Sequence, residues 1–322
     1  MLKKLAIIGA GNVACNSYLP YLVKRDDVEL VIQSRNFEKA KAAAAKFGIR
    51  AVETLAEVAT ENPASALVLT REESHIDIAK ALVDLGVRRL FIEKPLSARH
   101  GQANVTEEDY FESAAFLRHA ELKGCEVAMD FNYRFFLLSK KLREFIDAHG
   151  YGELKQSSML VNYACWSHCI DLLHHFGAKV KTVTALGGKG ENADLAAAFT
   201  LENGGTGTIL GTSAMHWSAS YYYCSLNFEK ALVTFEDLDS EMTVYEVGEE
   251  HRATYRLLNQ ASRWTQYHAS FAKSLEAYLA AIDEGQPPPV PGEDGLRELL
   301  FEAALRRSAA RRCPVDLESM KE

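Results

Sequence analysis

Short apolar runs alternate with amphipathic segments over the first third of the chain. The segments at 38–47 and 74–85 have helical periodicity, and each is followed by a glycine that can close a helix. Strands that alternate with helices are typical of βαβ units, so this region predicts a parallel sheet flanked by helices. The apolar runs that predict its strands lie at residues 5–8, 28–32, near 51, 66–69 and 89–92. One more helix, at 107–122, leads to a further strand at 126–129.

The pattern changes beyond residue 150, where apolar and polar positions alternate with a period of two. Such alternation, with Asn203-Gly204 as a hairpin turn, predicts a mainly antiparallel sheet. A helix at 167–176 precedes this sheet. Two helices, at about 267–283 and 293–307, follow it. The strands are expected at 180–186, 195–201, 206–210, 221–228, 232–235 and 242–247.

The first predicted strand leads directly into Gly9-Ala10-Gly11-Asn12-Val13-Ala14. In this GxGxxA turn the first glycine permits the tight turn, the second lets the backbone approach a pyrophosphate, and the alanine lets the helix pack closely. The free N–H groups of the helix then face the phosphates. We therefore expect Gly9, Gly11, Asn12 and Val13 to bind a dinucleotide.

The fold expected is α/β, with two domains. Residues 1–125 are predicted to form a Rossmann dinucleotide-binding domain. Residues 126–322 are predicted to form an α/β domain with an open, mainly antiparallel sheet for substrate binding and oligomerisation, and the last helices are candidates for packing back on the first domain. A length of 322 residues fits about two domains.

The residues after the second strand bear on which nicotinamide is bound. Ser34 stands where a carboxylate would read the ribose 2′-hydroxyl, and Arg35 can pair with a 2′-phosphate. The pair favours NADP. NAD stays possible, because an arginine here can also stack on adenine and serve either cofactor.

Composition excludes several classes of partner. The net charge is −8, and no basic stripe with interleaved aromatic residues is present, which argues against nucleic acid. The four arginines at 306, 307, 311 and 312 lie near Glu298 and Glu302, which favours a solvated helix face. No segment approaches the ~18 apolar residues of a membrane span. The apolar run before Gly9 is too short for a leader, so we expect a cytoplasmic protein without membrane contact, with its six cysteines reduced.

Further motifs occur in a fixed order along nearly the whole chain. Together with the first turn, they make the chain resemble the glucose–fructose oxidoreductase, inositol dehydrogenase and MocA family of sugar-type dehydrogenases. These motifs are Thr70 with His75, Glu93-Lys94-Pro95, Asn132-Tyr133-Arg134-Phe135, Gly150-Tyr151-Gly152-Glu153, His168 with Asp171, Gly285-x-Pro287-Pro288 and Gly292-Glu293-Asp294-Gly295.

The resemblance implies roles for particular residues. It makes Lys94 the lysine beside the nicotinamide and the reacting hydroxyl, where a cation stabilises a developing alkoxide. It also makes His168 the acid/base or substrate-binding residue. Taken alone, Lys94 is better explained as a surface lysine at a strand end before a proline turn. The other implied site residues are Thr70, His75 and Glu93 for the cofactor and Tyr133, Arg134, Asn162 and Asp171 for the substrate.

One position departs from the family. Many members carry an aspartate four residues before the histidine, and here that residue is Ala164. His168 and Asp171 are also consistent with an ordinary first turn of a helix. The nearby Cys165, Cys169, His174 and His175 invite a zinc interpretation, but they lack paired ligand spacing, so no metal is expected.

The resemblance implies NAD(P)-dependent oxidation of a secondary hydroxyl, or reduction of the ketone, on a sugar, polyol or nucleotide-sugar. It implies a homodimer or homotetramer and a substrate pocket at the domain junction. The alternative is a non-catalytic dinucleotide-binding sensor with the same fold. The absence of the family aspartate at position 164, where this chain has Ala164, favours it. If His168 carries the proton, its ionisation is expected near the unperturbed value of about 6.5.

Overall fold

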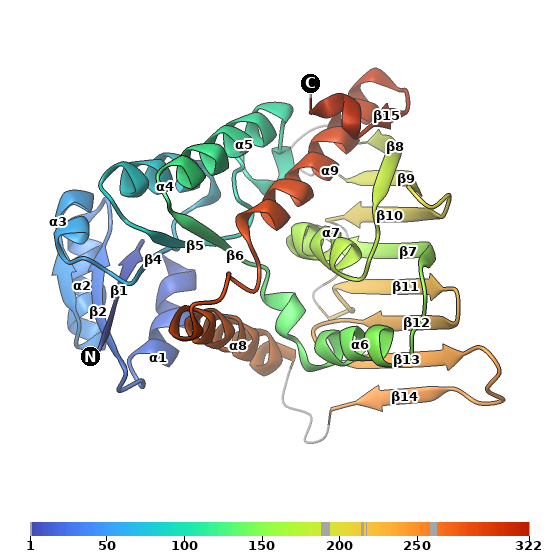
Figure 1. Cartoon of the computed structure of the whole chain (residues 1–322), viewed down its shortest axis with the longest axis horizontal. Coiled ribbons are helices and arrows are strands. Elements are labelled where there is room, and N and C mark those ends of the chain that lie inside the picture. Colours follow the sequence, from blue (N-terminus) through green and yellow to red (C-terminus); the bar gives the residue numbers. More distant parts are fainter. Residues whose placement is uncertain (1, 188–193, 214–215, 217, 258–262, 322) are drawn as a thin grey trace. The chain divides into compact units, whose positions relative to one another are not determined.

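The computed structural model describes residues 2–187, 194–213, 216, 218–257 and 263–321 (Figure 1). They form two compact units. The first contains the chain up to Gln102, Glu108–Phe131 and Phe271–Leu299. The second contains Ala103–Glu107, Asn132–Ser270 and the chain from Leu300 onward.

The first unit is built on a six-stranded parallel sheet in the order β3-β2-β1-β4-β5-β6. The parallel sheet and the βαβ pattern predicted from the sequence are confirmed. The order reverses beside β1, which is the switch point where open α/β sheets bind their ligands. The strands are β1 (Lys3–Ile8), β2 (Val28–Gln33), β3 (Arg50–Val52), β4 (Ser65–Val68), β5 (Arg89–Glu93) and β6 (Glu126–Asp130).

Local capping explains where several helices of this unit begin and end. The side chain of Asn36 accepts a hydrogen bond from the backbone N–H of Lys39 at 3.2 Å, and Gly48 closes the same helix in the left-handed conformation. The helices are α1 (Leu19–Leu22), preceded by the π-helical turn η1 (Ala14–Tyr18), α2 (Phe37–Phe47), α3 (Leu55–Thr60), α4 (His75–Asp84) and α5 (Glu107–Leu122).

Two segments from beyond residue 125 belong to the first unit. Strand β6 is the edge of its sheet, so the sheet extends past the domain boundary expected from the sequence. The unit also takes in most of α8 (Arg263–Glu284) and the start of α9 (Gly292–Arg311). The N–H of Met129 donates to Val290 O at 2.9 Å, and the Tyr278 hydroxyl lies 2.8 Å from Ser65 Oγ.

The second unit contains a nine-stranded sheet in the order β14-β13-β12-β11-β7-β10-β9-β8-β15. All neighbours in it are antiparallel except β7 and β10, so the mainly antiparallel sheet is confirmed. The strands are β7 (Leu154–Asn162), β8 (Val180–Gly187), β9 (Leu195–Leu201), β10 (Thr206–Thr212), β11 (Tyr222–Phe228), β12 (Ala231–Glu236), β13 (Glu241–Glu246), β14 (Ala253–Arg256) and β15 (Val315–Asp316).

Helices α6 (Leu137–Ala148) and α7 (Trp166–His175) lie on one face of this sheet (Figure 1). Burial alternates strictly along β9, from buried Leu195 to buried Leu201, so the opposite face is open. Among the described residues, no helix is both long enough and apolar enough to span a bilayer.

The arginines near the end of α9 do not form the solvated face that we expected. Arg306 pairs with Glu302 at 3.2 Å, and Glu302 is only 1% exposed. Arg307 forms an ion pair with Glu107. Only the later arginines, 311 and 312, are exposed. The prediction was wrong for Arg306 because Glu302, in the middle of α9, is buried and needs the cationic partner that Arg306 provides. It was wrong for Arg307 because this side chain reaches Glu107 at the start of α5.

Gly9 provides a stability test of the first turn. Its φ is +111°, and a Cβ there would lie 2.8 Å from the carbonyl oxygen of Leu69. Gly9→Ala should therefore lower the free energy of unfolding by about 1–3 kcal/mol. Gly11→Ala is the matched control: no atom lies within 4 Å of its added Cβ, so its stability should change little. Urea unfolding measures both. An equal loss in the two variants would contradict this account.

Candidate functional site

The glycine-rich turn lies at the carboxyl end of β1. The N–H of Gly9 donates to Gln33 O at 2.8 Å, which ties the turn to the neighbouring strand β2. Asn12 and Val13 are exposed at the start of the helical segment, and Ala14 is fully buried. A side chain at Gly9 would strike the backbone, whereas the space beside Gly11 is open. The turn therefore fits the approach of a pyrophosphate to its N–H groups.

Ser34 and Arg35 follow β2 at the same sheet edge. Ser34 is half-buried and Arg35 is exposed. The residue before them, Gln33, is buried, and its side-chain amide donates to Glu53 O at 3.1 Å, which ties the end of β2 to the end of β3. The guanidinium of Arg35 is thus solvent-accessible on a fixed strand end, where it can meet a phosphate or an adenine ring.

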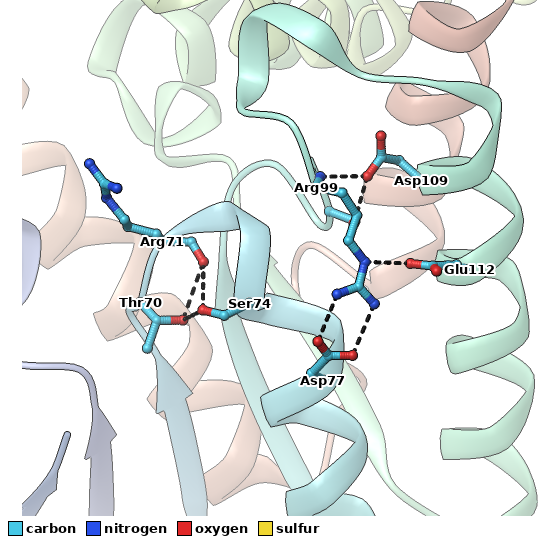
Figure 2. A network of polar contacts seen from close by, with 8 residues as sticks. Thr70, Arg71, Ser74, Asp77, Arg99, Asp109 and Glu112 are labelled. Carbon is cyan, nitrogen blue, oxygen red and sulfur yellow. Dashed lines mark hydrogen bonds and ion pairs between the residues drawn. The ribbon is translucent and has the colours of Figure 1, made fainter. Parts of the chain in front are cut away.

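Thr70 and His75 are held together after β4. The Ser74 hydroxyl oxygen lies 3.1 Å from Thr70 Oγ1 and 2.9 Å from Arg71 O, within hydrogen-bonding distance of both, as Figure 2 shows. The His75 ring is 1% exposed and lies between two carbonyl oxygens, Thr70 O at 3.1 Å and Pro95 O at 2.9 Å. Burial lowers the pKa of His75, so the neutral ring donates to one of them. The His75 ring thus lies between the loop after β4 and the loop after β5 and is hydrogen-bonded to one of them.

Lys94 follows β5, and its peptide bond to Pro95 is cis. The Lys94 ammonium donates to Gln102 Oε1 at 3.1 Å, and its backbone N–H donates to Glu93 Oε2 at 2.8 Å. Because β1, β4 and β5 are parallel, their carboxyl ends lie at one edge of the sheet. Lys94 therefore stands at the same edge as Gly9 and Thr70.

The loop after Lys94 is anchored to two helices by Arg99 (Figure 2). Its guanidinium donates to both carboxylate oxygens of Asp77 on α4, at 2.6 and 2.9 Å, and to Glu112 on α5 at 2.8 Å. The backbone N–H of Arg99 donates to Asp109 at 2.7 Å. The two-pronged contact with Asp77 has the planar geometry typical of arginine–carboxylate pairs, and it restrains the segment that carries Lys94.

Glu93 does not present its carboxylate to open space. Its side chain is buried, with Oε1 3.3 Å from the hydroxyl of Tyr18 on η1. The same hydroxyl donates to Asp130 at the end of β6, and Ser274 Oγ donates to Asp130 at 2.5 Å. Burial raises the pKa of Glu93 to about 8 and that of Asp130 to about 6.

In the second unit, Tyr133 and His168 form a stacked pair. Tyr133 lies on the short helix η4 (Asn132–Phe135) and His168 on α7, with ring centroids 3.9 Å apart and planes inclined by 8°. Both side chains are about 2% exposed. The Tyr133 hydroxyl lies 3.1 Å from Cys165 Sγ, and burial raises the pKa of Tyr133 well above its ordinary value. The stack fixes the plane of the imidazole.

Arg134 and Asp171 form a buried ion pair beside this stack. Arg134 Nε donates to Asp171 Oδ2 at 2.8 Å, and a second nitrogen of the guanidinium donates to Oδ1. Asp171 is 1% exposed and Arg134 is 9% exposed. Removing either partner would leave a buried charge without its partner, so the pair locks η4 to α7.

Asn162 and Ala164 lie just before α7. The Asn162 side-chain oxygen accepts a hydrogen bond from the backbone N–H of Ala164 at 2.9 Å. Asn162 therefore caps the turn Tyr163–Cys165 that leads into α7. Nearby, the Tyr163 hydroxyl accepts from Arg306 at 2.8 Å. Among the described residues, no group of three or more histidines, cysteines, aspartates and glutamates is arranged to hold a metal ion.

The expected residues thus fall into two groups. Gly9, Ser34, Thr70 and Lys94 share one sheet edge of the first unit, with His75 and Glu93 behind it. The second group, in the second unit, consists of Tyr133, Arg134, Asn162, His168 and Asp171.

Sequence reasoning missed Tyr18, Asp130 and Ser274. A signal existed for Asp130, because two neighbouring parallel strands each end in a carboxylate, Glu93 opposite Asp130.

Solved structures share this fold over nearly the whole chain. Their sequence identity to it is low, so the likeness establishes the fold and not the function. An oxidoreductase from Agrobacterium radiobacter, in complex with NAD+, L-tartaric acid and magnesium, has a TM-score of 0.83 at 16% identity over 99% of this chain and 100% of that one. Levoglucosan dehydrogenase, in complex with NADH and levoglucosan, has a TM-score of 0.83 at 17% identity over 98% and 100%. A super-repressor mutant of Gal80p from Saccharomyces cerevisiae has a TM-score of 0.80 at 13% identity over 100% and 99%.

No protein of curated function matches the sequence significantly. Models of a protein family do match it. Residues 3–115 match the NAD-binding Rossmann fold of an oxidoreductase family, and residues 151–317 match the C-terminal alpha/beta domain of the same family. Both matches agree with the motifs found in the sequence. The chain therefore belongs to the glucose–fructose oxidoreductase, inositol dehydrogenase and MocA family, an oxidoreductase family with an NAD-binding Rossmann fold.

Proposed function

We propose that this protein transfers a hydride between a nicotinamide cofactor and a secondary hydroxyl or ketone of a sugar, polyol or nucleotide-sugar. The observation that carries the proposal is the position of Lys94, which directly follows β5 at the same sheet edge as the glycine-rich turn after β1. A cation at this edge lies where a substrate would meet a bound dinucleotide.

The residues present fit such a cofactor. The turn contains Gly9 and Gly11, and a side chain at Gly9 would collide with the backbone. The helical segment that follows is exposed at its start, so its N–H groups can bind a pyrophosphate. Arg35 would hold a ribose phosphate. When bound, the nicotinamide supplies the ring carbon that accepts or returns the hydride.

In the proposed reaction, the hydroxyl proton of the substrate moves to His168 as the C–H bond breaks. The Lys94 ammonium stabilises the negative charge that develops on the hydroxyl oxygen. Tyr133 keeps the imidazole in one plane by stacking, and the Arg134–Asp171 pair holds α7 in register with η4. In the reverse direction, His168 returns the proton to the ketone oxygen.

The substrate class is proposed from the family, because the similar solved structures have too low a sequence identity for their ligands to be assigned to this protein. A screen of sugars, polyols and nucleotide-sugars against NAD and NADP, followed by the absorbance of the reduced cofactor, tests the activity. Turnover with a member of these classes supports the proposal, and turnover confined to another class would overturn the assignment.

A second candidate is a non-catalytic sensor that binds a dinucleotide. Ala164 favours it, because the position lacks the carboxylate that many family members place before the histidine. The fold of Gal80p, solved as a super-repressor mutant, is compatible with it. Retention of Lys94 and His168 opposes it. Cofactor binding without turnover on any substrate in the screen would favour the sensor.

We expect NADPH to bind more tightly than NADH. A charged hydrogen bond from Arg35 to the 2′-phosphate is worth about 1.5–3 kcal/mol, or about 10–100-fold in Kd. Arg35→Ala should raise the Kd of NADPH by that factor and change the Kd of NADH by less than about 3-fold. Ser34→Asp should reverse the preference by repelling the phosphate. Calorimetry on the wild type decides the issue, since tighter binding of NADH would contradict the preference.

Lys94→Ala should lower kcat by about 10²-fold or more while the Kd of the cofactor stays nearly unchanged. The reason is that Lys94 acts on charge that develops only in the transition state. Lys46→Ala, an exposed lysine at the end of α2, is the matched control and should keep wild-type turnover. Steady-state kinetics with the substrate found in the screen measures the effect. Near-normal kcat in Lys94→Ala would make it an ordinary strand-end lysine.

His168→Asn should depress kcat and remove one ionisation from its pH profile, because asparagine cannot carry the proton. Ala164→Asp restores the family carboxylate, and a carboxylate beside an imidazole favours its charged form, so the same ionisation should move to higher pH. Profiles of kcat between pH 5 and 9 show both effects. If rate and profile survive in His168→Asn, the proton is carried by another group, with Lys94 and Tyr163 the next candidates.

A further inference from the structure

Two carboxyl groups are buried side by side behind Lys94. Glu93 ends β5, Asp130 ends β6, and the two residues are direct partners in the parallel register of these strands. Asp130 is 0% exposed and Glu93 is 7% exposed. Two charged carboxylates in one buried site would repel each other and lose their hydration, so such pairs retain a proton.

The hydrogen bonds around the pair favour a proton on Glu93. The single hydroxyl proton of Tyr18 is donated to Asp130, which also accepts from Ser274 Oγ at 2.5 Å. Glu93 Oε1 lies 3.3 Å from the same Tyr18 oxygen, which has no second proton to give. A protonated Glu93 can donate to that oxygen. A continuous chain then runs from Glu93 through Tyr18 to a charged Asp130.

The other end of Glu93 is attached to Lys94. Oε2 of Glu93 accepts the backbone N–H of Lys94 at 2.8 Å. The positive charge of Lys94 also acts on both carboxyl groups and lowers the pKa of each, against the larger effect of burial. The groups that face the pair are therefore Tyr18 from η1, Lys94 from the end of β5 and Ser274 from α8.

We propose that Glu93 and Asp130 form a proton-sharing positioning pair for Lys94, with Glu93 protonated and Asp130 charged at neutral pH. The role in turnover rests on the function proposed above for Lys94. One negative charge behind the lysine balances its ammonium and leaves it directed towards Gln102 and the sheet edge. Loss of the Glu93 proton would place a second negative charge there and draw the ammonium back towards the pair.

The direction of the pH effect follows from the pKa of Glu93, raised to about 8. Below that pH the pair carries one charge and Lys94 is in place. Above it the second charge appears and kcat should fall. Glu93→Gln imitates the protonated acid, since its amide can donate to Tyr18 and its oxygen can accept from Lys94. This variant should lose the fall in kcat above pH 8, so that the ratio of its kcat at pH 9 to its own kcat at pH 7 stays at about 1.

Asp130→Asn removes the charge but keeps the shape. It should lower kcat by about 10-fold with KM little changed, because the ammonium loses its counter-charge. Glu61→Gln is the control. Glu61 pairs with Lys4 and Arg50, near the amino ends of strands in the same sheet, and should leave the kcat profile unchanged.

Stability gives a second readout that needs no substrate. The pKa values of Glu93 and Asp130 are raised in the folded protein, to about 8 and about 6, so the folded state binds more protons than the unfolded chain over this range. Their contribution to the free energy of unfolding therefore falls as pH rises from about 5 to 8. Glu93→Gln and Asp130→Asn should both flatten this fall. The hydrogen bond from Arg50 lowers the pKa of Glu61 to about 2, so Glu61→Gln should keep the wild-type slope.

Two direct measurements test the pair on the folded protein. Infrared difference spectra should show a protonated carboxyl band at pH 7 that Glu93→Gln removes. Acylation of Lys94 by acetic anhydride is followed by peptide mass spectrometry. Above pH 8 it should be slower in the wild type than in Glu93→Gln, whereas acylation of Lys46 should be equally fast in both proteins.

The outcomes separate the pair from the proposed function. Absence of the carboxyl band overturns the shared proton. Equal Lys94 acylation in the wild type and Glu93→Gln across the pH range overturns the positioning role. A wild type without turnover on any substrate, but with the band and the acylation difference present, refutes the proposed activity and supports the pair.

Discussion

The parallel register of β1, β4, β5 and β6 is the constraint on which the first unit depends. Hydrogen bonding between these strands places all their carboxyl ends at one edge. The glycine-rich turn, Thr70, Lys94 and Asp130 are far apart in sequence, yet each follows or ends one of these strands. A single geometric rule therefore assembles the residues that can hold a dinucleotide and the lysine that can act beside it.

Polar contacts hold these strand ends in place. The buried ring of His75 lies between the loops after β4 and β5, and the partly exposed guanidinium of Arg99 ties the loop beyond Lys94 to α4 and α5. A buried polar ring is costly unless it is hydrogen-bonded, so the His75 contact favours one arrangement of these loops. The second unit uses the same principle, since the Arg134–Asp171 pair fixes the helix that carries His168. The segments that carry Lys94 and His168 are thus both held by polar contacts of neighbouring residues.

Charge explains why the carboxyl groups of the two units behave differently. Asp171 meets a guanidinium with two matched hydrogen bonds, so it remains an anion inside the protein. Glu93 and Asp130 contact the hydroxyls of Tyr18 and Ser274 and the backbone N–H of Lys94, and the ammonium of Lys94 is the positive charge that acts on both acids. Retaining a proton on one of the two acids therefore costs less free energy than burying a second negative charge. The Arg134–Asp171 pair therefore has a structural role, whereas the Glu93–Asp130 pair is sensitive to pH.

The sequence by itself determined the alternation of strands and helices in the first unit, the glycine turn, the family and the candidates Lys94 and His168, because these follow from local periodicity and from motifs at fixed spacing. The order of the strands in the sheet came from the structure. It did not reveal β7, whose polar Ser157 and Ser158 interrupt the apolar pattern at the centre of its sheet. It also missed the roles of Tyr18, Asp130 and Ser274, which lie on η1, β6 and α8. Only the tertiary structure decides these contacts, since hydrogen bonds between distant segments leave no periodic trace in the chain.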